Sequence, residues 1–251
     1  MKIKLSRVSA GYDRSSVLRG IDLAVPSGDF RLVVGPNGAG KTTMLNAIFG
    51  ILRPTSGRIS VGDVDATSST LRALLDAGLA YVPQQSSTFP QMTVADNLEM
   101  GLFQIGAHRS EKLTLMKEVF SRFERLDQRK NMLARTLSGG ERRLLELARA
   151  LMIKPRALLL DEPSLGLSPV MMDRILDELI EINNQGVTVI LVEQRVKAAA
   201  RAAKSVSVLR LGRIVRNGSS ANAHDEGWLA SALYSDAVDP DGYAGVHGAN
   251  R

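Results

Sequence analysis

The sequence has no cysteine and only three histidines. Without cysteine, disulfide bonds and thiolate metal sites are excluded. His108, His224 and His247 do not share the spacing of a helical turn, so a histidine metal cluster is not expected. Metal chemistry that depends on thiolates or on clustered imidazole rings is therefore not expected in this chain.

Long hydrophobic runs are also missing from the sequence. No run approaches the roughly 18 apolar residues that cross a bilayer as a helix. The opening stretch MKIKLSRVSAGY alternates like an edge strand and lacks the apolar block of a signal peptide, so secretion is not expected.

Positive charge is in excess, but it is scattered. The formal net charge of +6 favours acidic partners, which include nucleotides, nucleic acid and anionic membrane surfaces. Lysine and arginine form no long run and are not interleaved with aromatic residues. We therefore expect no nucleic-acid partner.

Hydrophobic spacing predicts alternating helices and strands between residues 139 and 194. Apolar residues recur every three or four positions in 138–153 and 169–185, as in helices, whereas 156–163 and 187–194 are apolar runs typical of buried strands. Helix, strand, helix, strand is the pattern of a parallel sheet. The 44% of hydrophobic residues is enough for a sizeable core in one large domain or two small ones.

The flanking segments have other patterns. Residues 1–34 and 57–65 resemble short strands separated by turns, and apolar spacing predicts a helical insertion over about 86–138. SVSVLRLGRIVRNG, residues 205–218, predicts a hairpin. The tail 236–251 is polar and rich in glycine, so we expect it to be disordered.

VVGPNGAGKTT, residues 33–43, follows a predicted strand and opens a predicted helix. Gly35, Gly40, Lys41 and Thr42 satisfy G-x-x-x-x-G-K-[ST]. Glycines allow successive N–H groups to point at phosphate oxygens, the lysine reaches the β- and γ-phosphates, and the threonine hydroxyl suits Mg²⁺. The alternative is a purely structural glycine turn. The phosphate-binding prediction covers Gly35, Pro36, Asn37, Gly38, Ala39, Gly40, Lys41, Thr42 and Thr43.

Two carboxylates follow a buried strand in ALLLDEP, residues 157–163. Asp161 at the strand end can hold Mg²⁺ directly or through water. Glu162 emerges on another side of the chain and can orient and deprotonate an attacking water. The alternative is a polar strand end before a proline turn.

TLSGGERR, residues 136–143, begins another predicted helix. Ser138 and Glu141 form a capping box, which is a structural interpretation. Gly139 and Gly140 in the first turn each cost about 1 kcal/mol relative to alanine, and capping does not require them. A bare helix start with a serine hydroxyl could bind a phosphate, which is most useful if it faces the ATP of another copy.

These three motifs, in this order and spacing, resemble the ATP-binding subunit of an ABC transporter over about residues 1–235. The resemblance implies a P-loop NTPase core with a mixed, largely parallel sheet, an N-terminal antiparallel β subdomain made of residues 1–34 and 57–65, and the inserted helical subdomain. It also implies ATP and Mg²⁺ as ligands. Two subunits would meet head to tail, with Ser138, Gly139, Gly140 and Glu141 facing the partner's ATP.

The resemblance adds three further site residues. Tyr12 falls where family members stack an aromatic ring on adenine, although a lone strand tyrosine is also common in packing. Gln84, which ends the predicted strand 79–84, matches the glutamine that reaches Mg²⁺ and the attacking water and links to the transmembrane partner. Gln194 follows the strand VTVILVE, where most members have histidine; its amide can donate to the γ-phosphate but cannot accept a proton as imidazole can.

DEPSLGLSP, LVEQ and FPQMTVADNL resemble one branch, the ATPases of importers for branched-chain amino acids, urea and amides. The sequence departs from this branch in three places. Gln85-Ser86 replaces the usual Gly-Arg near the surface that would dock the transmembrane subunit, Arg195 replaces asparagine, and the helix that begins at Ser138, here called the signature helix, carries ERR where EQQ is common. FPQMTV is also a candidate surface for a membrane subunit, with Phe89, Pro90, Met92 and Val94 exposed; alternatively, Phe89 fills the helical core.

The implied function is an ATPase that powers an importer. Its partners would be a second copy or a paralogous ATPase, transmembrane permease subunits and, indirectly, an extracytoplasmic solute-binding protein. It would lie in the cytoplasm on the inner face of the cell membrane. The alternatives are a non-transport ABC ATPase acting on nucleic acid or ribosomes, and a module that binds ATP without turnover.

Overall fold

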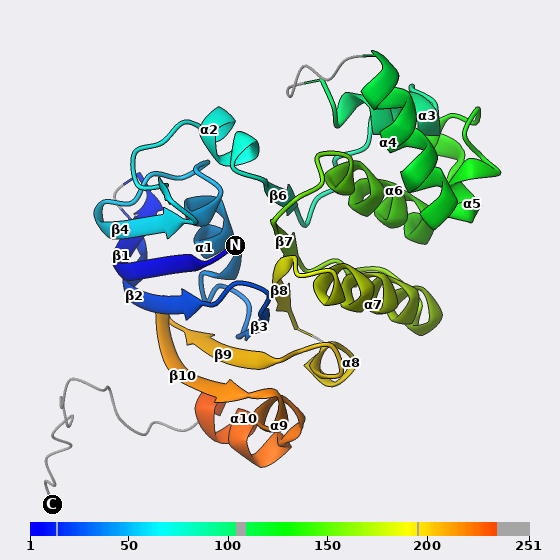
Figure 1. The fold of residues 1–251 in the computed structure, drawn as a ribbon. Coiled ribbons are helices and arrows are strands. Elements are labelled where there is room, and N and C mark those ends of the chain that lie inside the picture. Colours follow the sequence, from blue (N-terminus) through cyan, green and yellow to red (C-terminus); the bar gives the residue numbers. More distant parts are fainter. Residues whose placement is uncertain (14, 104–108, 195, 235–251) are drawn as a thin grey trace, which may run out of the picture.

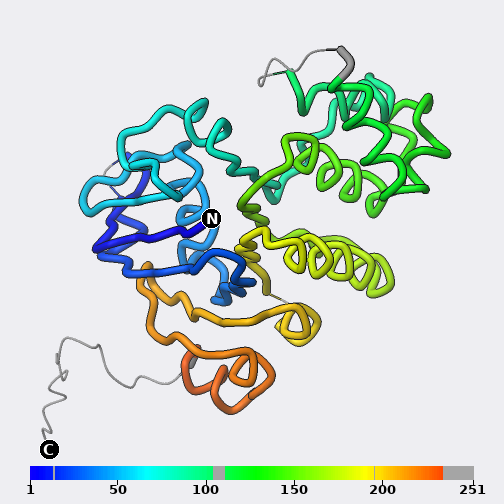
Figure 2. The backbone as a smooth tube through the Cα atoms, in the orientation of Figure 1, coloured from blue at the N-terminus to red at the C-terminus, as the bar shows by residue number. Residues whose placement is uncertain are grey.

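The computed structural model describes residues 1–13, 15–103, 109–194 and 196–234 (Figures 1 and 2). The predicted disorder of 236–251 and the departure at Arg195 lie outside these residues. Within the described chain, no helix has both the length and the apolar character required to cross a bilayer.

A six-stranded sheet forms the centre of the molecule, and it is mixed and largely parallel as the sequence predicts. Its strands have the order β10-β9-β3-β8-β7-β6. All are parallel to their neighbours except β10, which pairs antiparallel with β9. The largely apolar runs FRLVV, ALLLD and TVILVE, each with one charged residue, are buried at every position, because both faces of a parallel sheet are covered. The bounds are β3 (Phe30–Val34), β6 (Leu79–Val82), β7 (Ala157–Asp161), β8 (Thr188–Glu193), β9 (Ser205–Arg210) and β10 (Arg213–Ser219).

A second, antiparallel sheet has the order β2-β1-β4-β5. The sequence interpretation assigned all of residues 1–34 to this sheet, and that assignment is wrong for the last strand of the stretch. The third strand of that stretch, β3, pairs with β8 and β9 in the central sheet, because four of its five residues are apolar and need cover on both faces. The bounds are β1 (Ile3–Tyr12), β2 (Ser15–Val25), β4 (Ser56–Val61) and β5 (Val64–Asp65).

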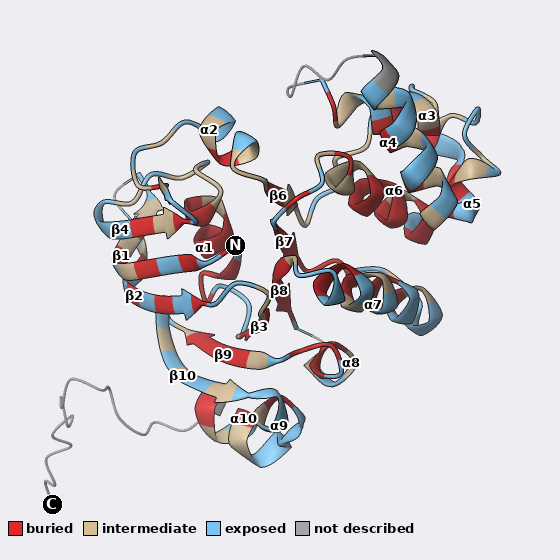
Figure 3. Ribbon diagram, viewed as in Figure 1, coloured by how far each residue is buried: buried red, intermediate tan, exposed pale blue. Residues whose placement is uncertain are grey.

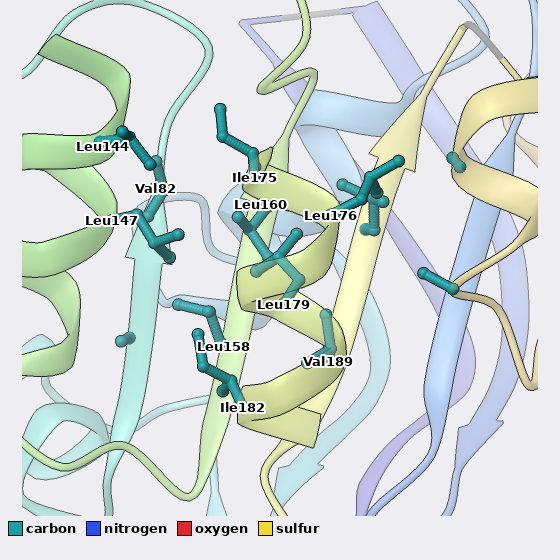
Figure 4. Close-up of a cluster of buried hydrophobic side chains, with 14 of the residues drawn as sticks. Val82, Leu144, Leu147, Leu158, Leu160, Ile175, Leu176, Leu179, Ile182 and Val189 are labelled. Atoms are coloured by element: carbon teal, nitrogen blue, oxygen red, sulfur yellow. The ribbon is translucent and has the colours of Figure 1, made fainter. Parts of the chain in front are cut away.

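Helices cover the central sheet on the side away from the antiparallel sheet (Figure 1). The helical segment contains α3 (Val94–Met100), α4 (Arg109–Arg122), α5 (Glu124–Asp127) and the 3₁₀ turn η1 (Ala134–Thr136), and α6 (Gly139–Leu151) joins it to the sheet. Helix α7 (Pro169–Asn184) lays its apolar stripe over β7 and β8, while α6 packs beside β6 (Figure 4).

The opposite face of the sheet packs against α1 (Lys41–Ile48) and the antiparallel sheet, which together form a second apolar core. Figure 3 shows buried residues concentrated along the central strands and on the sheet-facing sides of the helices. Short helices were not predicted because five to nine residues carry too few turns to show a helical period. These are α2 (Leu71–Asp76), α8 (Val196–Ala200), α9 (Ser220–His224) and α10 (Glu226–Tyr234).

Candidate functional site

The loop from β3 to α1 is shaped by glycine. Gly38 and Gly40 have φ values of 78° and 104°, which other residues adopt only with strain. A Cβ on Gly35 would lie 2.2 Å from the Leu209 carbonyl oxygen. Gly40 begins α1 without a side-chain cap among the described residues, so the first N–H groups of the helix are left for an anion.

Lys41 is buried at the start of α1. Its ammonium donates to the carbonyl oxygens of Gly35 at 2.9 Å and Pro36 at 3.1 Å. It also lies 3.3 Å from Oε1 of Glu162. The lysine charge is thus held over the loop and directed at the carboxylate that the sequence predicted as the base.

Asp161 ends β7 and is completely buried. Its Oδ1 has no hydrogen-bond partner among the described residues, whereas Oδ2 accepts from the Tyr81 hydroxyl at 3.5 Å. Burial raises the pKa of Asp161, which a hydrogen bond from Thr42 opposes. A buried carboxylate oxygen without a partner is costly, and a divalent cation beside Thr42 would satisfy it. The residues present therefore fit Mg²⁺.

Tyr81 and Asn46 were missed by the sequence interpretation. The Tyr81 hydroxyl reaches Oδ1 of Asn46 at 3.3 Å as well as Asp161. Burial raises the pKa of Tyr81, so its phenol stays protonated and can donate. No sequence signal marked Tyr81, because a tyrosine inside an apolar strand is usually only a packing residue.

Glu162 follows β7 in a left-handed conformation, with φ at 45°. This region is uncommon for a residue with a side chain and typically costs about 1–3 kcal/mol. Its N–H donates to the Val192 carbonyl at 2.9 Å, which fixes the turn against β8. The conformation directs the carboxylate away from Asp161 and toward the ends of the neighbouring strands.

Three side chains from separate segments converge on the Glu162 carboxylate. Gln84 Nε2 donates to Oε2 at 3.0 Å, and Gln194 Nε2 donates to both oxygens at 2.8 Å. Lys41 completes the set. Four residues that the sequence singled out separately, Gln84, Lys41, Glu162 and Gln194, are therefore brought together at one edge of the sheet.

Gln194 directly follows β8, which lies beside β7 in the sheet. Its position depends on Glu193, whose buried carboxylate accepts from the backbone N–H of Ser164 at 3.0 Å and its hydroxyl at 2.8 Å. The Gln194 N–H donates to the same carboxylate at 3.2 Å. Glu193 thus ties the loop of Gln194 to the loop after Glu162, which the sequence interpretation did not foresee.

The start of α6 has the predicted capping box. The Ser138 hydroxyl accepts from the Glu141 N–H, and the Glu141 carboxylate accepts from the Ser138 N–H. Arg125 and Arg129 also bind that carboxylate. The Glu141 side chain therefore caps the start of α6 and also links it to the helical segment.

The two glycines at this helix start differ. A Cβ on Gly139 would meet nothing within 4 Å, whereas one on Gly140 would lie 2.7 Å from the Met171 side chain. Packing against the Met171 side chain of α7 offers an explanation for Gly140 besides the expected ligand contact. Gly139 lies beside open space, as a backbone contact to an external ligand would need.

Tyr12 lies at the end of β1, and its ring is partly exposed. Its hydroxyl accepts from Asn46 Nδ2 at 3.2 Å. Because Asn46 belongs to α1, the ring is held beside the helix that begins with the glycine loop. This location is compatible with stacking on a base whose phosphates occupy that loop.

Comparisons with known proteins agree with this arrangement. The model of the family described as ABC transporter matches residues 18–165. The branched-chain amino acid transport ATP-binding protein BraG of Pseudomonas aeruginosa is 35% identical over 97% of this chain and 99% of its own. The lipopolysaccharide export ATP-binding protein LptB of Acidithiobacillus ferridurans is 31% identical over 90% and 93%.

A solved structure extends the likeness to a ligand-bound state. It is a dimeric ATP-binding cassette in a post-hydrolysis state with ADP and phosphate, 25% identical to this chain. The TM-score is 0.79, and the match covers 87% of this chain and 98% of the cassette.

The contact between Gln194 and Glu162 generates a test. Gln194→Ala should lower turnover on the order of 10²-fold, as expected for one well-aimed donor at a transition state, whereas ATP affinity should change little. Gln194→His should keep much of the activity, because imidazole can donate a similar hydrogen bond. Steady-state phosphate release and ATP titration measure both quantities. Gln128→Ala, an exposed glutamine of the helical segment, is the control; parental turnover in Gln194→Ala would contradict the assignment.

Proposed function

Because the chain belongs to the ATP-binding subunits of ABC transporters, which hydrolyse ATP, we propose that it powers the import of branched-chain amino acids or related small amides or urea. The observation that carries the proposal is the 35% identity to BraG over nearly the whole of both chains. The motifs DEPSLGLSP and LVEQ support the same branch. The likeness to LptB makes export of a lipid-linked glycan the second candidate.

The glycine loop would bind the ATP phosphates. Its N–H groups and the start of α1 would face the phosphate oxygens, and Lys41 would move from the carbonyls of Gly35 and Pro36 to the β- and γ-phosphates. Tyr12 would stack on the adenine. The adenine would therefore lie beside the antiparallel sheet, and the phosphates would lie at the edge of the central sheet.

Thr42, Asp161 and Gln84 would hold Mg²⁺, which when bound neutralises charge on the β- and γ-phosphates. Glu162 would accept the proton of the attacking water. In the structure, Gln84 and Gln194 donate hydrogen bonds to that carboxylate and Lys41 forms an ion pair with it. Transfer of Lys41 to phosphate would remove one donor from Oε1, which leaves that oxygen better able to accept a proton, while the two amides position the water and the γ-phosphate.

A second ATPase subunit would complete the site. Ser138, Gly139, Gly140 and Glu141 would face the ATP of that partner, which is either another copy of this chain or a paralogue. Gly139, with open space at its Cα, and the Ser138 hydroxyl would make the contact, and Glu141 would hold the helix start. Binding to permease subunits would place the pair at the inner face of the membrane. A solute-binding protein would act on the pair indirectly, through the permease.

The segment after Gln84 offers a surface for the permease. Phe89 and Met92 are 41% and 36% exposed, and Pro90 is exposed between them. The Phe89 ring lies over the Arg149 guanidinium, with 5.5 Å from Cζ to the ring centre, and does not fill the helical core. The prediction that Val94 belongs to this surface is wrong, because Val94 is fully buried at the start of α3. Exposed apolar side chains of this kind suit a helix of a membrane subunit.

Solute uptake tests the proposed function directly. The complex that co-purifies with this chain, reconstituted in vesicles, should take up labelled leucine or urea only with ATP, and uptake should stop without this chain. A complex that instead releases lipopolysaccharide, and takes up neither solute, would replace import by export.

Glu162→Gln tests the proposed base. The amide should still accept and donate hydrogen bonds but cannot take a proton, so ATP binding should persist and hydrolysis should stop. The chain should then accumulate as an ATP-held dimer, alone or with its paralogue, as size-exclusion chromatography would detect. If hydrolysis continues near the parental rate, another group is the base.

Phe89→Asp tests the docking surface. A carboxylate in an apolar contact should weaken permease coupling, because it would have to be desolvated, while phosphate release by the isolated chain should persist. The control is Val215→Asp, an exposed apolar residue on β10. Equal loss of uptake in both variants, or misfolding of Phe89→Asp, would argue against a specific docking role.

A further inference from the structure

Helix α6 carries a buried ion pair among apolar neighbours. Nη1 of Arg143 lies 2.6 Å from Oε2 of Glu146, and both side chains are more than nine-tenths buried. Buried charges remain stable only when further hydrogen bonds satisfy them. The partners of this pair therefore show which parts of the molecule it holds.

The Arg143 guanidinium binds the two loops that bear Gln84 and Glu162. Nη1 donates to the Pro83 carbonyl at 2.8 Å and Nη2 to that of Gln84 at 3.3 Å, both just after β6. Nε donates to the Pro163 carbonyl at 3.2 Å. Nη2 also reaches the carbonyls of Asp161 and Glu162 at 3.4 and 3.3 Å. One planar group thus joins the ends of β6 and β7.

This contact bears on the strained turn at Glu162. Its left-handed φ of 45° persists only where the surroundings fix it. Val192 fixes the N–H side of the residue, and Arg143 binds its carbonyl. The direction of the Glu162 carboxylate, toward Gln84 and Gln194, follows from that turn.

Glu146 connects the same pair to the exposed segment after Gln84. Its Oε1 accepts from the Ser86 hydroxyl at 2.8 Å and from the Ser87 N–H at 2.9 Å. Ser86 belongs to the sequence departure at positions 85–86, and Arg143 to the departure at the signature helix. The two departures are therefore parts of one hydrogen-bonded network in this chain.

We propose that Arg143, oriented by Glu146, is a positioning residue for ATP hydrolysis: its guanidinium holds the turns of Gln84 and Glu162 so that the amide and the carboxylate meet at the reacting water. The inference rests on the proposed role of Glu162. It adds a role for two charged residues inside the signature helix that do not touch the nucleotide. The same network connects the proposed docking surface at Phe89, Pro90 and Met92 to Glu162 through Ser87, Glu146 and Arg143.

Arg143→Lys separates positioning from simple charge pairing. Lysine keeps a positive charge beside Glu146, but an ammonium cannot span the carbonyls that a planar guanidinium reaches. Turnover should fall on the order of 10–100-fold, as expected when a reacting group is misplaced by about 1 Å, while ATP affinity stays within about twofold of parental. Arg142→Lys is the matched control, because within the described chain Arg142 donates to the Leu137 carbonyl and to neither of the loops that bear Gln84 and Glu162.

A second variant tests the inference if Arg143→Lys fails to fold. Arg143→Met with Glu146→Leu removes both charges, and such apolar replacements often preserve stability. The folded double variant should bind ATP normally and show the same loss of turnover. Parental turnover in either folded variant would overturn the inference and make the pair purely structural.

Glu162→Gln, assayed alongside, keeps the two proposals apart. A Glu162→Gln chain that does not hydrolyse ATP, beside an Arg143→Lys chain with parental turnover, overturns the positioning role alone. A Glu162→Gln chain that hydrolyses ATP near the parental rate overturns the proposed base and, with it, the reason for positioning it.

Discussion

The site depends on the Glu162 carboxylate, because it binds side chains from three segments that are distant in sequence, two by hydrogen bonds and one by an ion pair. Lys41, Gln84 and Gln194 each lie at the end of a different strand or at the start of the helix that follows one. Their N–H groups meet one pair of oxygens. Movement of any of these three segments would therefore change the contacts of the Glu162 carboxylate.

Sheet topology makes this convergence possible. The strands β3, β8, β7 and β6 are consecutive neighbours, and all four are parallel, so their carboxyl ends share one edge. In open α/β sheets, ligands bind at that edge. The glycine loop, Gln194, Asp161 with Glu162, and Gln84 follow these four strands in that spatial order. Burial of the sheet on both faces fixes this edge, and the side chains of Arg143 and Glu193 hold the loops beyond it.

Much of this could be predicted from the sequence where one segment carries its own signal. The glycine loop, the strand that ends at Asp161 and the capping box at Ser138 each combine a local pattern with a chemical requirement. The place of β3 could not be assigned in the same way, because its partners β8 and β9 lie more than 150 residues later in the chain. The exposure of Val94 was misjudged because a short polar segment does not reveal which apolar residue starts the next helix.

The interactions between segments were the least predictable part. Glu146 and Arg143 look like ordinary charges of a helix surface in the sequence, yet they are buried against two loops. Gly140 looks like a ligand contact, yet Met171 of α7 fills the space beside it. In each case the decisive partner comes from a distant element, and no local pattern specifies it. These are also the residues through which the sheet edge is held to the helical segment.

A crystal structure of the Glu162→Gln chain with ATP and Mg²⁺ tests the central account most directly. The account predicts that residue 162 and Gln194 flank a water in line with the γ-phosphate, that Lys41 has moved onto the phosphates, and that Oδ1 of Asp161 faces the metal site. A structure in which residue 162 lies away from the γ-phosphate, with another group holding the water, would contradict it.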